Sequence, residues 1–469
     1  MLGLIAQKNG RSERAVQLLI KAAKLDPHRP EILCDLGNAF KSLSRHKDAI
    51  KAHRMVLTML PNSPEAHSNL GAAYKKAMIC FESALKMRPK DVELKFNLGN
   101  GLVASERYEE AEEVLRQVVY EKPGHISAQI NLCAALKEQG RYEKAIHRYE
   151  KAIAAVPDSA EAHWNYALTL LATGNYADGW NEYEWRSLLP GFAMEKMDRP
   201  QWQGEALEGR TLLVHAEQGL GDTLQFVRYL PQIQSVDGDV VFACPDRLMK
   251  LLQPVAKNIQ LVPLGKRPDH DVQSPLMSLP RLFHDGLPFE PTDGAYIFPD
   301  AARVAAWGEK LGAPSGRRIG IAWQGSMGYQ HDGRRSIPLL NFEPLARLDN
   351  IQLVSLQQGG GADQIAEMPW RDRILDMTVE MDTDHAFVDT LAVMASLDLV
   401  VTSDTAIAHL AGAAGIPVWV ALCHLPDWRW GLEGESSPWY DSMRLVRQEH
   451  AGDWTGVFRR ISATIAGDA

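Results

Sequence analysis

The sequence predicts a chain with two kinds of fold, an α-helical solenoid followed by an α/β region built from two halves. Two observations carry this prediction. Prolines recur about every 34 residues in the N-terminal part, and the remainder alternates short apolar runs with glycine-rich turns and amphipathic stretches. A chain of 469 residues is also too long for one ordinary domain, so several compact units are expected.

The composition is that of a globular protein, and it excludes several classes of function. Hydrophobic residues make up 45% and charged residues 23% of the chain, and the formal net charge of -9 gives no basic surface for nucleic acid. No apolar stretch approaches the ~20 residues of a membrane span, and the chain opens without a signal-peptide pattern. We therefore expect a soluble cytoplasmic protein with reduced, scattered thiols: Cys34, Cys80, Cys133, Cys244 and Cys423.

The repeats can be followed by their small residues and their closing prolines. Small residues recur where the two helices of a pair approach closely, as at Gly37 with Ala49 and at Gly99 with Ala111. This pattern resembles the tetratricopeptide repeat, a helix pair closed by proline, and the resemblance covers residues 1–186. The closing prolines are separated by 34, 28, 34 and 34 residues: Pro27, Pro61, Pro89, Pro123 and Pro157.

Two irregularities interrupt the repeat pattern. The array begins at Leu2-Gly3, which corresponds to the middle of a first helix, so upstream residues are expected either to have been removed or never to have existed. The 28-residue interval is short by six residues between Tyr74 and Ala77, where a turn should join two helices. That repeat is expected either to fuse its helices or to lack a loop.

One column of the array carries an amide side chain in four repeats. Stacked helix pairs place equivalent positions in a line along one surface, and amides can bind an extended peptide backbone without selecting its sequence. The array thus resembles that of the O-linked N-acetylglucosamine transferases, which implies an acceptor protein in the repeat groove. The alternative is that the amides bond only between neighbouring repeats. The four candidates are Asn69, Asn97, Asn131 and Asn165.

The α/β region is expected to follow a linker at residues 187–209, which is packed by Trp202. Strands alternating with helices predict parallel, doubly wound sheets in an N-terminal half, residues 210–312, and a C-terminal half, residues 313–469. Ligands of such sheets bind at the carboxyl ends of the strands. The predicted strands are residues 211–214, 239–243, 259–262, 318–323, 353–356, 397–401 and 418–422.

The N-terminal half opens with a strand, a glycine turn and a helix over His215–Pro231. Gly219 and Gly221 would let a ligand approach the backbone at the helix start, so both are candidates for donor binding. Asp222 lies at the same turn and is either a helix cap or a group with a chemical task. His215 and Glu217, at the same strand end, are competing candidates for that task.

The C-terminal half contains a second strand, turn and helix over Leu399–Gly415. Asp404 and Thr405 form the turn, and Thr405 suits a helix cap. The amides behind it, unhindered by the methyl group of Ala406, could hold a diphosphate. A basic turn elsewhere in this half offers Arg335, whose guanidinium suits phosphate. His409, on the small-residue helix, is expected to bond to a nucleotide or to backbone.

Together these two segments resemble the heptosyltransferase-like glycosyltransferases of GT-B fold, whose two halves are Rossmann-like. By this resemblance Gly221-Asp222 match the turn with the proposed catalytic base, and Asp404, Thr405 and His409 match the nucleotide-sugar turn. The sequence departs from that family at Ala406, at Arg335 in place of lysine, and in its Pro426–Trp430 segment. Fusion to tetratricopeptide repeats is typical of protein glycosyltransferases, including flagellin-modifying enzymes.

The expected function is transfer of a sugar from a nucleotide-sugar donor to a hydroxyl of a protein acceptor such as flagellin. Asp222 would take the acceptor proton, and Arg335 with the helix after Thr405 would stabilise the departing diphosphate. No cofactor is expected, and the resemblance implies no metal. Asp382–Asp384 resemble a metal-binding DxD motif, but they lead into a helix near Phe387 and so predict a capping turn. The alternatives are transfer to a small carbohydrate and a non-catalytic repeat scaffold with a degenerate transferase domain.

Overall fold

The computed structural model describes residues 12–26, 29–43, 45–60, 64–189, 192, 198–233, 237–283, 294–314, 316–326, 332–382 and 384–467. The chain divides into two compact units, one within residues 1–165 and the other within residues 166–326 and 331–469. Leu2-Gly3, Pro27, Pro61 and Thr383 lie outside the described residues. No helix in the described part is long and apolar enough to cross a bilayer.

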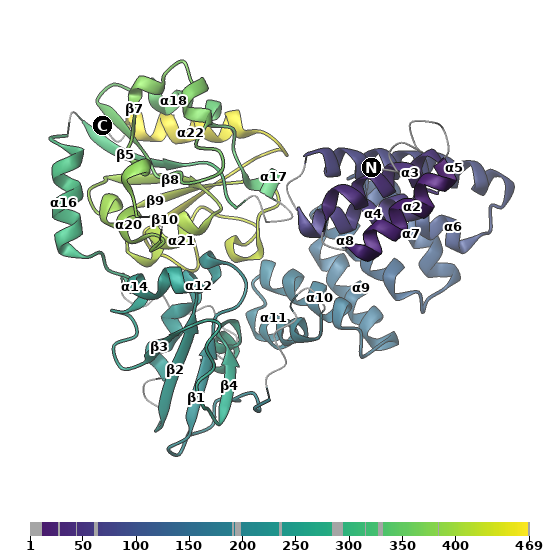
Figure 1. The fold of residues 1–469 in the computed structure, drawn as a ribbon, viewed down its shortest axis with the longest axis horizontal. Coiled ribbons are helices and arrows are strands. Elements are labelled where there is room, and N and C mark those ends of the chain that lie inside the picture. Colours follow the sequence, from purple (N-terminus) through teal and green to yellow (C-terminus); the bar gives the residue numbers. More distant parts are fainter. Residues whose placement is uncertain are drawn as a thin grey trace. The chain divides into compact units, whose positions relative to one another are not determined.

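The first unit is an α-helical solenoid, as the repeat period predicts (Figure 1). Consecutive helices from α2 to α9 pack against each other, and the later prolines, Pro89, Pro123 and Pro157, lie in turns between helix pairs. The helices are α2 (Ser12–Leu25), α3 (Pro30–Ser42), α4 (His46–Met59), α5 (Pro64–Met87), α6 (Val92–Ala104), α7 (Tyr108–Glu121), α8 (Ile126–Glu138) and α9 (Tyr142–Ala155), and the boundary between the two units falls within α10 (Ala160–Ala172).

The repeat glycines are small because a second helix lies against them. A Cβ atom on Gly99 would come 2.6 Å from the side chain of Leu115, and one on Gly37 would come 2.6 Å from the imidazole of His53. Such distances are shorter than any van der Waals contact. The sequence period of small residues therefore records the close approach of paired helices.

The short repeat fuses its two helices. α5 runs without a break over 24 residues, so the stretch between Tyr74 and Ala77 is helical and the turn is absent. Gly71 occupies the glycine position of this repeat, and a Cβ atom there would meet no described atom within 4 Å. Without a folded-back partner, the glycine of this repeat has lost its packing role.

The second unit contains two parallel sheets. Among the described residues, β3-β2-β1-β4 form one sheet and β10-β9-β8-β5-β6-β7 the other. All the pairings between these strands are parallel. The strands are β1 (Thr211–His215), β2 (Asp239–Cys244), β3 (Gln260–Pro263), β4 (Val272–Pro275), β5 (Arg317–Ala322), β6 (Ile351–Ser355), β7 (Ile374–Asp376), β8 (Leu399–Ser403), β9 (Val418–Leu422) and β10 (Met443–Arg447).

Helices cover both faces of the larger sheet (Figure 1). One core joins β5, β6 and β8 to α18 and α22 through residues such as Ile319, Leu345 and Phe458. The helices of this unit are α11 (Tyr176–Tyr183), α12 (Leu220–Phe226), α13 (Leu230–Ile233), α14 (Met249–Leu252), α15 (Leu279–Phe283), α16 (Ala301–Leu311), α17 (Asp332–Arg335), α18 (Glu343–Ala346), α19 (Gln364–Glu367), α20 (Val388–Met394), α21 (Ala406–Ala413) and α22 (Trp454–Gly467), with 3₁₀ turns between several of them.

Three strands and part of the linker differ from the sequence prediction. β4, β7 and β10 are missing from the predicted list because they are short or, as in Met443–Arg447, interrupt the apolar run with arginine. Trp202 is fully buried, as predicted, and its backbone N–H donates to Gln273 O at 2.8 Å. The end of the expected linker thus extends the small sheet beside β4, whereas Pro190 and Gly191 lie outside the described residues.

Candidate functional site

Both sheets reverse their strand order where the sequence places its candidate residues. In the larger sheet β5 lies between β6 and β8, and in the smaller one β1 lies between β2 and β4. Connections on the two sides of such a point leave the sheet in opposite directions, which opens a crevice at the carboxyl ends of the strands. The loops after β1, β5 and β8 are therefore the expected position of a ligand.

The turn after β8 carries the predicted donor-side residues. β8 ends at Ser403 and α21 begins at Ala406, with Asp404 and Thr405 between them. Thr405 occupies the N-cap position, as predicted, but its hydroxyl makes no capping hydrogen bond and instead lies 3.4 Å from Thr402 Oγ1. The side chain of Thr405 thus leaves the first amides of α21 uncapped, which suits an incoming anion.

Asp404 is the most strongly perturbed carboxyl of this turn. Burial raises its pKa to about 6, and the nearby carboxylate of Asp427 adds to the rise. Arg335 opposes it, as does the indole of Trp430, although the Trp430 N–H lies outside hydrogen-bond geometry. A carboxyl in this state changes charge close to neutral pH.

Arg335 lies beside the loop that follows β5. Its Nε donates to Asp332 Oδ1 at 3.1 Å, and its side chain is 20% exposed. A Cβ atom on Gly325 would lie 2.6 Å from Arg335 Nη2. The guanidinium therefore packs closely on the Gly325 backbone, in the same half of the second unit as Asp404.

Asp222 lies in the first turn of α12 and joins the two halves of the second unit. Its Oδ2 accepts from the Gly219 N–H at 2.8 Å, and its Oδ1 accepts from Arg429 Nη2. Burial raises the pKa of Asp222, while Arg429 and the Gly219 N–H oppose that rise. The side chain remains 19% exposed. Asp222 is therefore both a helix cap and an ion-paired carboxylate.

The two competing candidates at the end of β1 have other partners. His215 Nε2 lies 3.0 Å from Gln273 Oε1, and burial lowers the pKa of His215, so the ring stays neutral. Glu217 accepts two hydrogen bonds from Arg186, at 2.6 and 3.1 Å, and one from the Met277 N–H at 3.2 Å. Of the three predicted bases, Glu217 is thus held by a bidentate ion pair.

Gly221 brings the start of α12 against the start of α21. A Cβ atom on Gly221 would come 3.1 Å from His409 Cδ2 and 3.5 Å from Ala406 Cα. Close helix packing therefore accounts for this glycine, whereas we predicted backbone approach to a ligand. His409 is buried, and its Nδ1 lies 3.0 Å from the Tyr440 hydroxyl, a partner that the sequence did not indicate.

Arg429 belongs to the site but was not among the predicted site residues. Its Nη1 donates to Asp427 Oδ1 at 2.7 Å and its Nε to Gln225 Oε1 at 2.9 Å, in addition to the Asp222 ion pair. It also lies 4.4 Å from the ring centre of Trp428. The signal was present in the sequence, because Pro426–Trp430 departs from the pattern of the family that the chain resembles.

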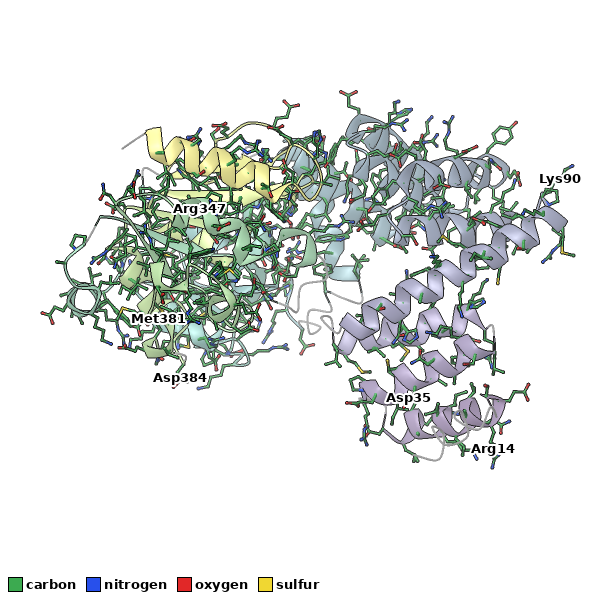
Figure 2. The ribbon with its side chains drawn as sticks, turned by 90° about the horizontal axis from the view of Figure 1, so that it is seen from above. Arg14, Asp35, Lys90, Arg347, Met381 and Asp384 are labelled. Atoms are coloured by element: carbon green, nitrogen blue, oxygen red, sulfur yellow. The ribbon has the colours of Figure 1, made fainter. Side chains whose placement is uncertain are left out.

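Asp382 closes a local turn, but this turn does not cap the following helix as predicted, because the N-cap of α20 is Phe387 and no side chain caps it. The Asp382 carboxylate accepts from the N–H of Asp384 at 2.9 Å and from the N–H of His385 at 3.2 Å. The His385 ring holds the pKa of Asp382 at about 2, and Asp384 lies at the periphery of the second unit (Figure 2). The described residues contain no group of side chains suited to a metal ion.

The four asparagines lie on the first helix of successive repeats, in α5, α6, α8 and α10. Asn97 donates to Glu93 O at 2.5 Å, and Asn165 donates to Glu161 O at 2.8 Å, each within its own helix. Asn69 instead contacts Cys34 Sγ of the preceding repeat at 3.7 Å. Three of these amide groups are thus bonded to the solenoid itself, as the alternative interpretation of the asparagines expects.

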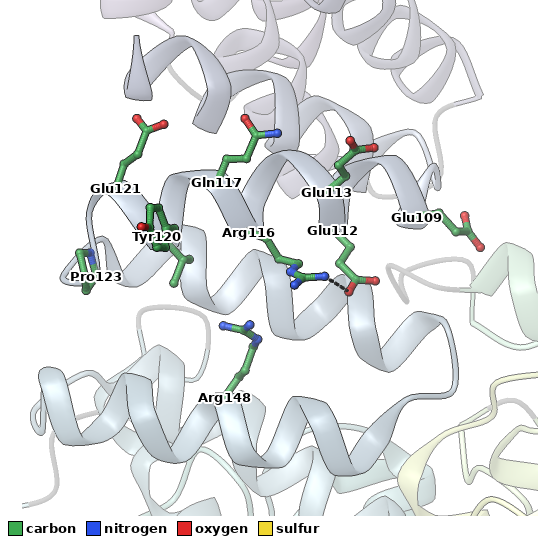
Figure 3. Close-up of a pocket in the computed structure, with 10 residues that line it drawn as sticks. Glu109, Glu112, Glu113, Arg116, Gln117, Tyr120, Glu121, Pro123 and Arg148 are labelled. Atoms are coloured by element: carbon green, nitrogen blue, oxygen red, sulfur yellow. Dashed lines mark ion pairs between the residues drawn. The ribbon is translucent and has the colours of Figure 1, made fainter. Parts of the chain in front are cut away.

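A groove also lies on the second helices of the repeats. It has a volume of about 950 Å³ along α7 and is bounded by Arg148 of α9. Arg116 and Arg148 point toward each other, whereas Glu113 and Gln117 point away from α9 (Figure 3). None of the four asparagines lines this groove. The solenoid thus offers a second surface besides the asparagine column.

Comparisons with known proteins identify the repeats. Models described as tetratricopeptide repeats match residues 1–73, 72–136 and 134–174. The N-terminal part of the chain is therefore a tetratricopeptide solenoid. The chain is 28% identical to Protein FlbA of Caulobacter vibrioides over 323 residues, which are 61% of this chain and 52% of FlbA. It thus spans about half the length of this curated relative.

Solved structures also resemble parts of the chain. A double mutant of MamA from strain RS-1 shares 20% identity with a TM-score of 0.23 and covers 39% of this chain and 88% of that one. YrrB, a tetratricopeptide protein with an unusual peptide-binding site, shares 19% identity with a TM-score of 0.24 and covers 37% of this chain and 92% of its own.

Proposed function

We propose that this protein is a metal-independent glycosyltransferase of GT-B type, which moves a sugar from a nucleotide-sugar donor to a hydroxyl of a protein acceptor. The observation that carries the proposal is the meeting of α12 and α21 at Gly221 and Ala406. At this meeting, Asp222 lies where the smaller sheet reverses its strand order, and the uncapped start of α21 lies where the larger sheet does so.

Each side of this meeting point has a chemical role in the proposal. Arg335 and the first amides of α21 hold the diphosphate and stabilise the charge that develops on it as the sugar leaves. Asp222 accepts the proton of the acceptor hydroxyl. Arg429 supports this role because its positive charge opposes the rise in the pKa of Asp222 and so favours the carboxylate form.

The repeats recruit the acceptor in this proposal. Tetratricopeptide solenoids are protein-binding modules, and the asparagine column and the groove on α7 each offer a surface for an extended segment. An acceptor such as flagellin, modified in the cytoplasm, is consistent with both. Transfer to a small carbohydrate, with the repeats docking a separate partner, is the alternative within the same chemistry.

Donor binding is tested by thermal shift with a panel of nucleoside diphosphates. A ligand at about 100 times its Kd should raise the Tm by roughly 5 °C, and Arg335→Gln should remove most of the shift. Arg347→Gln is the matched control, since Arg347 is in the same half but is 75% exposed. If no nucleotide raises the Tm, the chain is a scaffold whose transferase fold has lost its activity.

The base is tested by Asp222→Asn, which should lower turnover about 10²- to 10⁴-fold with little change in donor affinity. Asp427→Asn is the comparison, because Asp427 binds the same arginine without being the proposed base. Equal losses in the two variants would assign Asp222 an electrostatic role. An active Asp222→Asn enzyme would move the base to His215 or Glu217.

A further inference from the structure

The segment between the solenoid and the sheets packs against the candidate site. α11 and the 3₁₀ turn after it, Glu184–Leu188, belong to the second compact unit. Trp180, Tyr183 and Arg186 of this segment are each 1% exposed. Two routes of contact lead from these side chains to Asp222.

The first route passes through the loop between β1 and α12. Arg186 binds Glu217 with two hydrogen bonds, of 2.6 and 3.1 Å, and binds Ser278 Oγ at 2.9 Å. The Tyr183 hydroxyl accepts from Gln218 Nε2 at 3.0 Å. Gln218 has a φ of 62°, which costs free energy in a residue with a side chain. The hydrogen bond that Gln218 donates to Tyr183 helps to hold this backbone conformation. The next residue is Gly219, whose N–H binds Asp222.

The second route passes through the loop that carries Arg429. The Trp180 ring meets the Trp428 ring edge-on at 5.4 Å, and the Tyr183 ring lies 6.2 Å from the same indole. Arg429 covers the Trp428 ring and pairs with Asp222. One short segment therefore supports the loops on both sides of the proposed base.

We propose that Tyr183 and Arg186 are positioning residues, through which the segment that follows the repeats sets the geometry of Asp222. This inference rests on the proposed function for its catalytic meaning. A purely structural segment could fill the same space with apolar side chains, because a buried ion pair adds little net stability over well-packed hydrophobic groups. The bidentate Arg186–Glu217 pair instead fixes the orientation of the loop that leads to Asp222, and a catalytic base requires a fixed orientation.

The test compares Tyr183→Phe with Tyr176→Phe in the full chain. Both changes remove one hydroxyl from the same helix, but only Tyr183 binds the loop, whereas Tyr176 packs its ring on Trp439. Hydrogen–deuterium exchange should become at least threefold faster at residues 217–222 in Tyr183→Phe and remain unchanged in Tyr176→Phe. Unchanged exchange in Tyr183→Phe, or the same increase in both variants, overturns the proposal.

A kinetic measurement separates positioning from binding. With an active donor, Tyr183→Phe should lower kcat about tenfold, the usual effect of one lost hydrogen bond, and leave the donor KM unchanged. A rise in KM at constant kcat contradicts positioning. If the wild-type protein turns over no donor, the proposed function fails, while the exchange measurement still decides whether Tyr183 holds the loop.

Arg186 needs a variant that leaves no charge buried alone. The double variant Arg186→Met with Glu217→Gln removes both charges of the buried pair. Glu184, which Arg186 also binds at 3.0 Å, keeps its charge but is 24% exposed to water, so the Tm should stay within a few degrees of wild type. It should still reproduce the faster exchange at residues 217–222. A double variant with wild-type exchange and wild-type kcat would show that the ion pair is dispensable for positioning.

Discussion

Asp404 is a buried carboxyl beside a second carboxylate, Asp427, and its pKa of about 6 has a consequence for stability. A carboxyl whose pKa is higher in the folded than in the unfolded protein stabilises the fold when protonated. That contribution is complete below pH 3.8, the unfolded value, and is lost as the pH rises through 6. At neutral pH the ionised carboxylate of Asp404 therefore lowers the stability of the fold.

Asp404→Asn should consequently raise the Tm by about 2 to 3 °C at pH 7.5, because the neutral amide avoids the charge repulsion. At pH 4.5 the gain should fall to less than half of that at pH 7.5, since Asp404 is then protonated in the folded protein but still mostly ionised in the unfolded chain, whose pKa is 3.8. Thermal melting at both values measures the difference. A gain of the same size at pH 4.5 would show that packing, and not titration, is responsible.

His53 is the opposite case, in the first unit. It is fully buried, and neither of its ring nitrogens has a hydrogen-bond partner among the described residues. Burial lowers its pKa from 6.5 to about 4, with a smaller effect of Lys41. The stability that depends on the neutral ring is complete above pH 6.5 and is lost as the pH falls toward 4.

His53→Leu should therefore weaken the loss of stability between pH 7 and pH 4.5 by roughly 1 to 2 kcal/mol. His147→Leu is the control, because the His147 side chain is 65% exposed. Calorimetry at both pH values checks the result. An equal pH dependence in the wild type and His53→Leu would mean that the buried ring takes up its proton without cost.

At the scale of the element, equivalent repeat glycines are predicted to respond in opposite ways. Gly99→Ala forces a methyl group into Leu115 and should destabilise the solenoid by about 1 to 3 kcal/mol. Gly71→Ala meets empty space within the continuous helix α5 and should stabilise it by about 0.5 to 1 kcal/mol, through helix propensity alone. Urea denaturation measures both. A loss at Gly71 would mean that a partner covers α5 in solution.

The elements also explain what the sequence could locate. Long amphipathic helices and apolar strands were predictable, because burial of one face leaves a period in the residues. β10 was not, since its arginines are held by local partners, as when Arg447 Nη1 donates to Gly431 O at 3.0 Å. A strand tolerates polar residues where hydrogen bonds to other parts of the fold satisfy them. Such bonds leave no periodic pattern in the sequence, so the strand cannot be recognised from it.

At the scale of the whole molecule, the boundary between repeats and sheets predicts which fragments fold. A fragment of residues 210–469 would leave Glu217 buried without Arg186, and it would expose the indole of Trp428 that Trp180 covers. Loss of one partner of a buried ion pair costs about 3–5 kcal/mol. A fragment of residues 175–469 keeps α11 with its N-cap, Asn175.

The longer fragment should therefore melt cooperatively, and the shorter one should melt at least 5 °C lower or aggregate. Scanning calorimetry and limited proteolysis of the two fragments compare them directly. Equal melting temperatures would place the functional boundary after Arg186, as the repeat period alone suggests.

The sequence by itself determined the repeat period, the alternation of strands and helices that implies parallel sheets, and the turns that hold Asp222 and Asp404, because each depends on neighbours close in the chain. It did not determine the partners of those residues. Arg429 reaches Asp222 from 207 positions away, and Gly221 faces His409 of the opposite half. Only the tertiary structure could decide these pairings, since the ion pair and the close contact each join loops of different sheets and so depend on how the two sheets pack together.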